Sequence, residues 1–369
     1  MKSKRNRIVE YDMLRLICTL LIVFAWASFG KVSTAYGGVD YINFLGRNSY
    51  SVFYKNVSFF SEIIYDFCPS LCMALSGGLF YRMRKKKKQT FGVLLMSKAK
   101  RLLIPFVIVS CLYVLPWKWF GGYYSDSENW LYDFLMGQIL LQGNTHLWYL
   151  AALFFIFAGI YLLEKLIKNK LGGKLLFLWI LSWLSLLMPV VLIRLIMRYS
   201  LWFYTGYCFE KHRTVFNSLL KRYHILGFGC MFVLFFRIDG FVSCNTDMLS
   251  VFIHMILHTV CTLTWCCTVY GISFYLSRSK TAGNQIFEIL SENSFGIYLY
   301  SEPLNYVILS IAVSAAGNRI FVSDICALLL FISRFIIMLI VSLQISAQLR
   351  KRIMRKRIKS TRGILQFLI

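Results

Sequence analysis

The sequence predicts an all-α, polytopic integral membrane protein with about ten transmembrane helices and with both termini in the cytoplasm. The first observation is that 58% of its 369 residues are hydrophobic and gather in runs long enough to cross a bilayer. The second is that every second gap between these runs is basic, and these gaps hold 32 of the 41 Lys and Arg residues. The basic gaps are Lys2–Arg15, Arg82–Arg101, Lys165–Lys174, Lys211–Arg222, Arg278–Lys280 and Arg350–Arg362. Because basic loops stay on the cytoplasmic side, this alternation predicts both the number of crossings and their orientation.

Ten apolar runs are assigned as membrane-crossing helices, since a hydrocarbon core needs roughly 20 apolar residues per helix. They are Leu14–Gly30, Val57–Tyr81, Leu102–Leu115, His146–Leu163, Leu175–Val191, Tyr199–Glu210, Tyr223–Phe236, Val251–Leu276, Ser294–Ala315 and Ser323–Gln348. Ten crossings place both termini on one side, in agreement with the charges. The first run lacks a small-residue cleavage site, so we expect a retained helix and not a signal peptide.

We expect one helical bundle over residues 1–348 and a short basic tail over residues 349–369. The tail alternates basic and apolar residues, which is typical of an amphipathic helix lying on the cytoplasmic leaflet. The sequence shows no internal repeat and predicts no second, soluble domain.

The formal net charge of +25 predicts a lipid partner rather than a nucleic acid. In a soluble protein this charge would suggest nucleic-acid binding. Here it is confined to one side of a membrane, so anionic lipid head groups are the expected partner. The 11 cysteines lie mostly inside apolar runs, and no CxxC motif pairs with a second one. We therefore expect free thiols, with no disulfide framework and no metal.

Several ionisable residues fall inside the apolar runs, where they are costly and usually functional. Glu62 and Asp66 are four residues apart and share one face of the second run, as His254 and His258 share a face of the eighth. Glu302 precedes Pro303 in the ninth run, and Arg334 lies midway along the tenth; the proline frees backbone groups beside the carboxylate. These groups either pair with one another to hold the bundle together or line a polar cavity, and the sequence leaves both open.

A basic cluster lies at the mouth of the third run, where Lys98, Lys100 and Arg101 precede Leu102. Arg15 occupies the equivalent place in the first run. Such cations can hold a phosphorylated molecule by charge and by forked hydrogen bonds, or they can anchor lipid head groups. The two long outer segments, 31–56 and 116–145, are rich in aromatic residues, which suits the membrane–water interface and also suits stacking on sugar rings.

These features coincide with a resemblance to the membrane acyltransferase-3 family of bacterial surface-sugar O-acyltransferases. Five segments resemble its motifs in the same order: RIVEYDMLRLICTLLIVFAWASFG from Arg7, with Asp12 and Arg15; PSLCMALSGGLF from Pro69, with Ser76 and Gly77; KAKRLLIP from Lys98; HLWYL from His146; and SFGIYLYSEP from Ser294. The matches extend over nearly the whole chain.

The resemblance implies a transferase of the bacterial plasma membrane that moves an acyl group from cytoplasmic acyl-CoA, most simply acetyl-CoA, to a hydroxyl of a cell-envelope polysaccharide or glycolipid. The predicted cofactor-binding residues, which would hold the CoA phosphates, are Arg15, Lys98, Lys100 and Arg101. The predicted substrate-binding residues are Asp12, Trp26, Glu62, Asp66, Trp148 and Ser301.

This chain departs from the family at the residue that the family uses as its base. The family has a histidine eleven residues after the arginine of the first helix, where Trp26 stands here, roughly 18 Å along the helix from Leu14. The indole N–H only donates, so Trp26 cannot act as a base. Ser301 replaces the histidine of the ninth-helix motif. His146 and Glu302 are therefore the predicted catalytic residues.

Two alternatives remain open at this level. A member that has lost its base could serve in the export or translocation of a surface glycan, with the bundle and its cavity retained. A small-molecule transporter would also use intramembrane carboxylates, but the paired, broken halves typical of such transporters are missing from the sequence.

Overall fold

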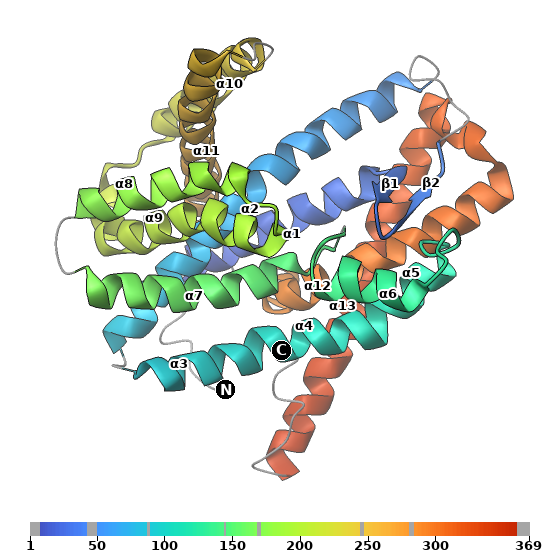
Figure 1. Cartoon of the computed structure of the whole chain (residues 1–369), viewed down its shortest axis with the longest axis horizontal. Coiled ribbons are helices and arrows are strands. Elements are labelled where there is room, and N and C mark those ends of the chain that lie inside the picture. The colour runs from blue at the N-terminus through green and yellow to red at the C-terminus, as the bar shows by residue number, and fades with distance from the viewer. Residues whose placement is uncertain are drawn as a thin grey trace.

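The computed structural model is a helical bundle with one small β-hairpin, and it describes residues 8–42, 50–86, 89–143, 145–167, 171–243, 247–279 and 284–359 (Figure 1). Its elements in chain order are α1 (Val9–Ser28), β1 (Lys31–Thr34), β2 (Gly37–Asp40), α2 (Val52–Lys86), α3 (Phe91–Lys98), α4 (Ile104–Val109), α5 (Leu115–Phe120), α6 (Trp130–Phe134), α7 (Trp148–Leu166), α8 (Leu171–Leu184), α9 (Val191–Leu219), α10 (Arg222–Val242), α11 (Met248–Leu276), α12 (Gln285–Ala316) and α13 (Asp324–Lys359).

Each of the ten predicted runs coincides with a helical pass, with α3, α4 and α5 forming one pass together. Among the described residues, seven passes are long and apolar enough to cross a membrane. The other three are α8, which has only 14 residues, and α9 and α12, which carry charged side chains such as Arg198 and Glu302. Helices are the expected element, because lipid offers no hydrogen bonds to the backbone. The prediction of an all-α, polytopic membrane protein is confirmed.

The third pass is longer than its apolar run predicted, because two prolines are accommodated without ending the helix. It runs from Phe91 to Phe120 through two π-helical turns, Ala99–Leu103 and Ser110–Val114. The turns lie directly before α4 and α5, and Pro105 and Pro116 occupy the first turn of these helices, where no backbone donor is needed.

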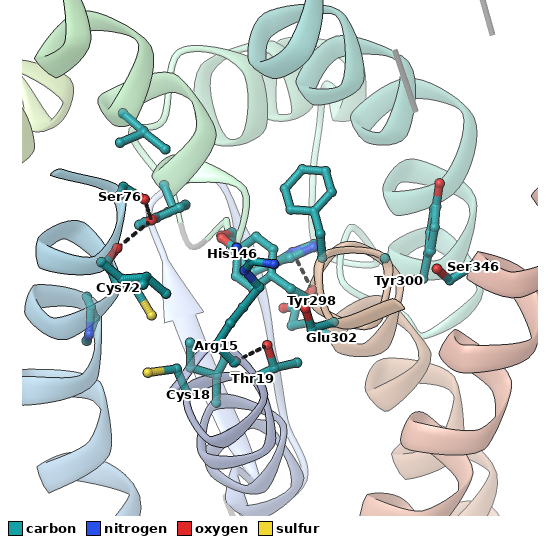
Figure 2. Close-up of a pocket in the computed structure, with 18 of the residues that line it drawn as sticks. Arg15, Cys18, Thr19, Cys72, Ser76, His146, Tyr298, Tyr300, Glu302 and Ser346 are labelled. Atoms are coloured by element: carbon teal, nitrogen blue, oxygen red, sulfur yellow. Dashed lines mark hydrogen bonds and ion pairs between the residues drawn. The ribbon is translucent and has the colours of Figure 1, made fainter. Parts of the chain in front are cut away.

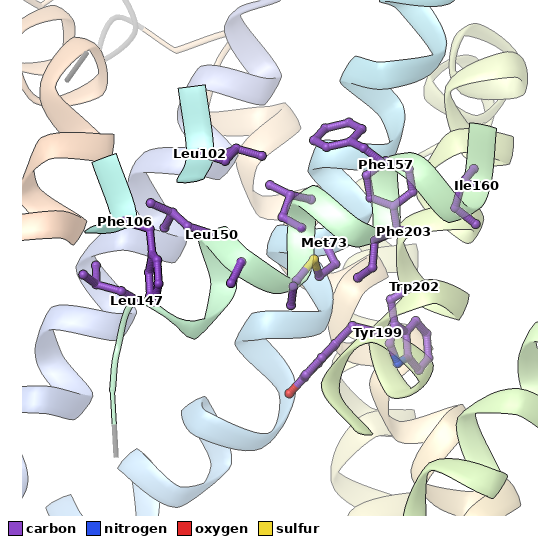
Figure 3. Close-up of a cluster of buried hydrophobic side chains, with 14 of the residues drawn as sticks. Met73, Leu102, Phe106, Leu147, Leu150, Phe157, Ile160, Tyr199, Trp202 and Phe203 are labelled. Carbon is purple, nitrogen blue, oxygen red and sulfur yellow. The ribbon is translucent and has the colours of Figure 1, made fainter. Parts of the chain in front are cut away.

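The core of the bundle lies where α2, α4, α7 and α9 meet. Figure 3 shows Met73 of α2, Phe106 of α4, Phe157 of α7 and Phe203 of α9 within one apolar cluster. Two glycines let α2 and α9 touch: a Cβ at Gly77 would lie 1.8 Å from the carbonyl oxygen of Phe203, and a Cβ at Gly206 would lie 1.8 Å from that of Ala74. The Ser-Gly segment at Ser76 therefore has a packing reason, since small residues permit close approach of membrane helices.

The outer segments contain structure that the sequence did not predict. Strands β1 and β2 pair antiparallel, with Lys31 opposite Asp40, and the backbone N–H of Gly38 donates to the carbonyl of Tyr123 at 2.9 Å. In Figure 1 the hairpin lies beside α5 and α6. At the other end of the chain, α13 continues through Leu349 as far as Lys359, so the first half of the predicted tail extends the last helix; residues 360–369 lie outside the described part.

Candidate active site

One large cavity runs through the bundle, with a volume of about 1830 Å³. It is lined from Arg15, Lys98 and Arg101, through Trp26, His146 and Glu302, to Lys31–Ser33 of β1. Figure 2 shows its wall built from α1, which carries Arg15, Cys18 and Thr19, from α2 with Cys72 and Ser76, and from α12 with Tyr298, Tyr300 and Glu302. Typical small-ligand pockets hold about 300–1,000 Å³, so this cavity has room for two substrates.

Cations concentrate at the end of the cavity that is predicted to be cytoplasmic. Arg15 on α1 lies 3.5 Å from Asp12, and its side chain remains 38% exposed. Lys98 lies with its Nζ atom 3.7 Å from the ring centre of Phe157, and Arg101 follows it in the π-helical turn. Three of the four predicted phosphate-binding residues therefore line one cavity, whereas Lys100 is not among its described lining residues.

A histidine–carboxylate pair is buried in the wall further along. His146 Nδ1 lies 3.0 Å from Glu302 Oε2, and the two side chains are 1% and 3% exposed. Tyr306 donates its hydroxyl to Glu302 Oε1 at 2.7 Å. The two predicted catalytic residues are thus in contact, although 156 positions separate them in the sequence.

Pro303 explains how the histidine is oriented. In a regular helix the carbonyl of Leu299 would accept the N–H of residue 303, which proline lacks. His146 Nε2 lies 3.1 Å from this carbonyl oxygen, and since the carbonyl can only accept, Nε2 carries the proton. Nδ1 then lies 3.0 Å from Glu302 Oε2, a close contact in which neither atom makes a hydrogen bond to a described residue.

Among the described contacts, Nε2 is therefore held by a hydrogen bond, whereas Nδ1 and Glu302 Oε2 are buried without a hydrogen-bond partner. An acceptor hydroxyl that reached Nδ1 or Glu302 Oε2 would therefore meet a buried polar atom that has no other hydrogen bond to give up within the described part of the chain.

A series of hydrogen-bonded, buried polar side chains leads from Lys118 to Thr145, the residue before His146. Lys118 is 1% exposed, and its Nζ atom lies 3.4 Å from Gln138 Oε1. Gln138 in turn donates to Thr145, next to His146, at 2.6 Å, and to Ser110 at 3.2 Å. The ammonium also lies 5.5 Å from the ring centre of Tyr306, which bonds Glu302.

Sequence reasoning missed Lys118 because it lies in a segment interpreted as an outer loop. The available signal was a lysine between two tryptophans, Trp117 and Trp119, directly after an apolar run.

Trp26, one of the predicted substrate-binding residues, lies next to His146 of the pair. Its ring centre is 5.4 Å from that of His146, with the rings near perpendicular. Its backbone carbonyl accepts hydrogen bonds from Asn305 at 2.7 Å and from Arg334 at 3.3 Å. Arg334 is 1% exposed and also bonds Asn305 Oδ1 at 2.7 Å and the carbonyl of Phe29 at 2.6 Å. The buried arginine thus fixes the end of α1 beside the site.

The remaining predicted residues divide between those that line the cavity and those that lie elsewhere in the bundle. Asp12 and Trp148 line the cavity, as Trp26 does. Ser301 is buried and donates to the carbonyl of Ile297 at 2.7 Å, and Glu62 is exposed. Asp66 bonds Arg198 and His258, each at 3.0 Å. Glu62, Asp66 and Ser301 are absent from the described lining of the cavity. For Asp66 the alternative of pairing within the bundle is therefore the one that the structure supports.

Fold and site define a multi-pass membrane protein with a buried acid–base pair inside a long cavity. A family model described as an acyltransferase domain matches residues 8–349. The chain therefore belongs to this family of membrane acyltransferases. No curated protein and no solved structure shows a significant match to it.

Proposed function

We propose that this membrane acyltransferase moves an acyl group, most simply acetyl, from cytoplasmic acyl-CoA to a hydroxyl of a cell-envelope polysaccharide or glycolipid in the bacterial plasma membrane. The observation that carries this proposal is that one cavity is lined both by Arg15 and Arg101 at its cationic end and by the buried His146–Glu302 pair. A donor and an acceptor that enter from opposite ends would meet inside it.

The donor fits the cationic end. Arg15, Lys98 and Arg101 line the cavity there, and arginine forks and lysine ammonium groups bind phosphates by charge-assisted hydrogen bonds. The thioester arm would extend along α1 toward Trp26, which lies 11 residues and about 16 Å beyond Arg15. Free coenzyme A or acyl-CoA is thus the expected ligand of this end, and lipid head groups remain the expected partner of the basic surface outside it.

The acceptor fits the other end, where Lys31–Ser33 and Phe29 line the cavity. Its hydroxyl oxygen would attack the thioester carbonyl carbon, the carbon–sulfur bond to CoA would break, and the hydroxyl proton would pass through the His146–Glu302 pair to the departing thiolate. Lys118 would stabilise Glu302 through Tyr306, which donates to the carboxylate.

The test is acetyl transfer in membranes that contain the wild type or one of four variants. His146→Ala and Glu302→Gln should lower kcat by about 10²–10⁴-fold, the usual range for a positioned acid–base group. Arg15→Ala and Arg101→Ala should raise the KM for acetyl-CoA by about 10- to 100-fold, as expected for a lost hydrogen bond to a charged group. His254→Ala is the matched control, since His254 pairs with Asp239 and does not line the cavity among the described residues. Unchanged activity in all four variants would refute the site.

A second function is favoured by Trp26, whose indole N–H cannot act as a base: a catalytically decayed member that exports or translocates a surface glycan. Trp26→His separates the two, because the new imidazole would lie next to His146. If the wild type shows no acetylation and Trp26→His gains it, the protein is a decayed enzyme. Loss of glycan export without any acetylation identifies a conduit.

A further inference from the structure

Three cysteines meet where α1 crosses α2. Cys18 comes from α1, and Cys68 and Cys72 lie four residues apart on one face of α2. Their three sulfur atoms all lie within 4.8 Å of one another. Cys68 and Cys18 are buried, Cys72 is half-buried, and Cys18 and Cys72 line the cavity. Figure 2 shows both of these sulfur atoms at the wall between the two helices.

We propose that Cys18, Cys68 and Cys72 bind one zinc ion through their three thiolates, with the fourth coordination position open to the cavity. Zinc–thiolate bonds of about 2.3 Å in a tetrahedral site place sulfur atoms roughly 3.8 Å apart. Since the sulfur atoms lie within 4.8 Å of one another, they would have to approach by about 1 Å at most to reach that geometry. Three protein ligands and one open position are also the usual form of a zinc site that faces a cavity.

Charge favours zinc over the other ion that prefers thiolates, copper(I). Three thiolates with Zn²⁺ carry a net charge of −1, whereas three thiolates with Cu⁺ carry −2. A smaller net charge costs less in an apolar surrounding. Arg15 lies one helical turn before Cys18 and lines the same cavity, so positive charge stands close to the site.

The sequence led us to expect no metal because it contains no paired CxxC motifs. That rule applies to ligands close together in one chain segment. Here two ligands are spaced at one helical turn, and the third is 50 residues away, so only the crossing of α1 and α2 brings them together.

The test is the metal content of the full-length protein, purified in detergent under reducing conditions and measured by inductively coupled plasma mass spectrometry. We expect about one zinc ion per chain, as for a structural or catalytic zinc site. Cys72→Ser and Cys18→Ser should lower zinc occupancy at limiting zinc by at least about tenfold, since even the loss of an outer-shell partner costs 10- to 100-fold in affinity. Cys111→Ser and Cys230→Ser are the matched controls, because both thiols are exposed, and they should keep the zinc.

A thiol count gives an independent readout that does not depend on acyl transfer. With zinc bound, a chelator should increase the number of reactive thiols in the wild type, first by the half-buried Cys72, but should not increase it in Cys72→Ser. A wild-type protein that takes up no zinc after reconstitution overturns the proposal, as does a disulfide among these cysteines in the reduced preparation. Copper at the site in place of zinc overturns the assignment of the ion.

Discussion

Two histidine–carboxylate pairs in this protein have the same contact distance and very different surroundings. His146 and Glu302 lie 3.0 Å apart, and so do His258 and Asp66. The first pair is at most 3% exposed and lines the cavity, whereas the side chains of His258 and Asp66 are 23% and 39% exposed. Asp66 has a further partner in Arg198, at 3.0 Å.

The difference teaches that an intramembrane ion pair is not by itself a site. Both pairs satisfy the rule that charged groups inside a membrane find partners. Only the His146–Glu302 pair combines burial with access to a substrate-sized space and a backbone carbonyl, that of Leu299, that orients the imidazole. The surroundings of the pair, and not its separation, therefore suggest chemistry.

The largest expected effect comes from neutralising the two carboxylates in turn. Glu302→Gln should lower acetyl transfer by about 10²–10⁴-fold, because it removes the proton-exchanging partner of His146. Asp66→Asn should change the rate by less than about threefold, since Asp66 lies outside the described lining of the cavity. Initial rates at saturating acetyl-CoA in membranes with equal amounts of protein measure both. Equal losses of acetyl-transfer rate in the two variants would show that the buried His146–Glu302 pair is no more important for activity than the His258–Asp66 pair.

The second expected effect concerns stability and compares the arginines of the two regions. Arg334→Ala leaves the carbonyl of Phe29 and Asn305 Oδ1 without their buried donor, while the carbonyl of Trp26 keeps Asn305, so we expect it to lower the free energy of unfolding by about 2–5 kcal/mol. Arg198→Ala should cost about 1 kcal/mol or less, because its side chain is 42% exposed. Unfolding of the detergent-solubilised protein, followed by circular dichroism, gives the two values. Similar costs would show that burial does not separate the two regions.

Much of the fold could be predicted from composition and charge, because a backbone in lipid has to satisfy its own hydrogen bonds and therefore forms helices. Each of the ten runs marks a pass, although Pro105 and Pro116 concealed the length of the third. The β-hairpin at Lys31 was not predictable, since it is held by Tyr123, some 90 residues further along the chain.

The site was predictable only in part. The HLWYL motif suggested His146, and the free-energy cost of a carboxylate inside an apolar run suggested Glu302. The contact between them depends on how α7 and α12 pack, which the sequence does not show. For Lys118 the flanking tryptophans were the available signal, but they did not show its burial, which depends on its contacts with Gln138 and Tyr123. Glu62 and Asp66 also lie inside an apolar run, but unlike Glu302 they are absent from the described lining of the cavity. The sequence alone does not distinguish these carboxylates from Glu302.

The smallest expected effect tests the orienting carbonyl itself. Pro303→Ala restores a backbone N–H at position 303, which would bond the carbonyl of Leu299 within the helix and compete with His146 Nε2. The imidazole would lose a hydrogen bond worth about 0.5–1.5 kcal/mol, so acetyl transfer should fall by about 2- to 10-fold while α12 becomes no less stable. Paired measurements of kcat and of unfolding separate this effect from simple damage. A lower kcat with an unchanged or higher midpoint of unfolding supports the orienting role. A smaller effect of Pro303→Ala on kcat when His146→Ala is already present supports it as well. A proline that merely bends the helix would lower both kcat and stability, and its effect on kcat would be the same with or without the histidine.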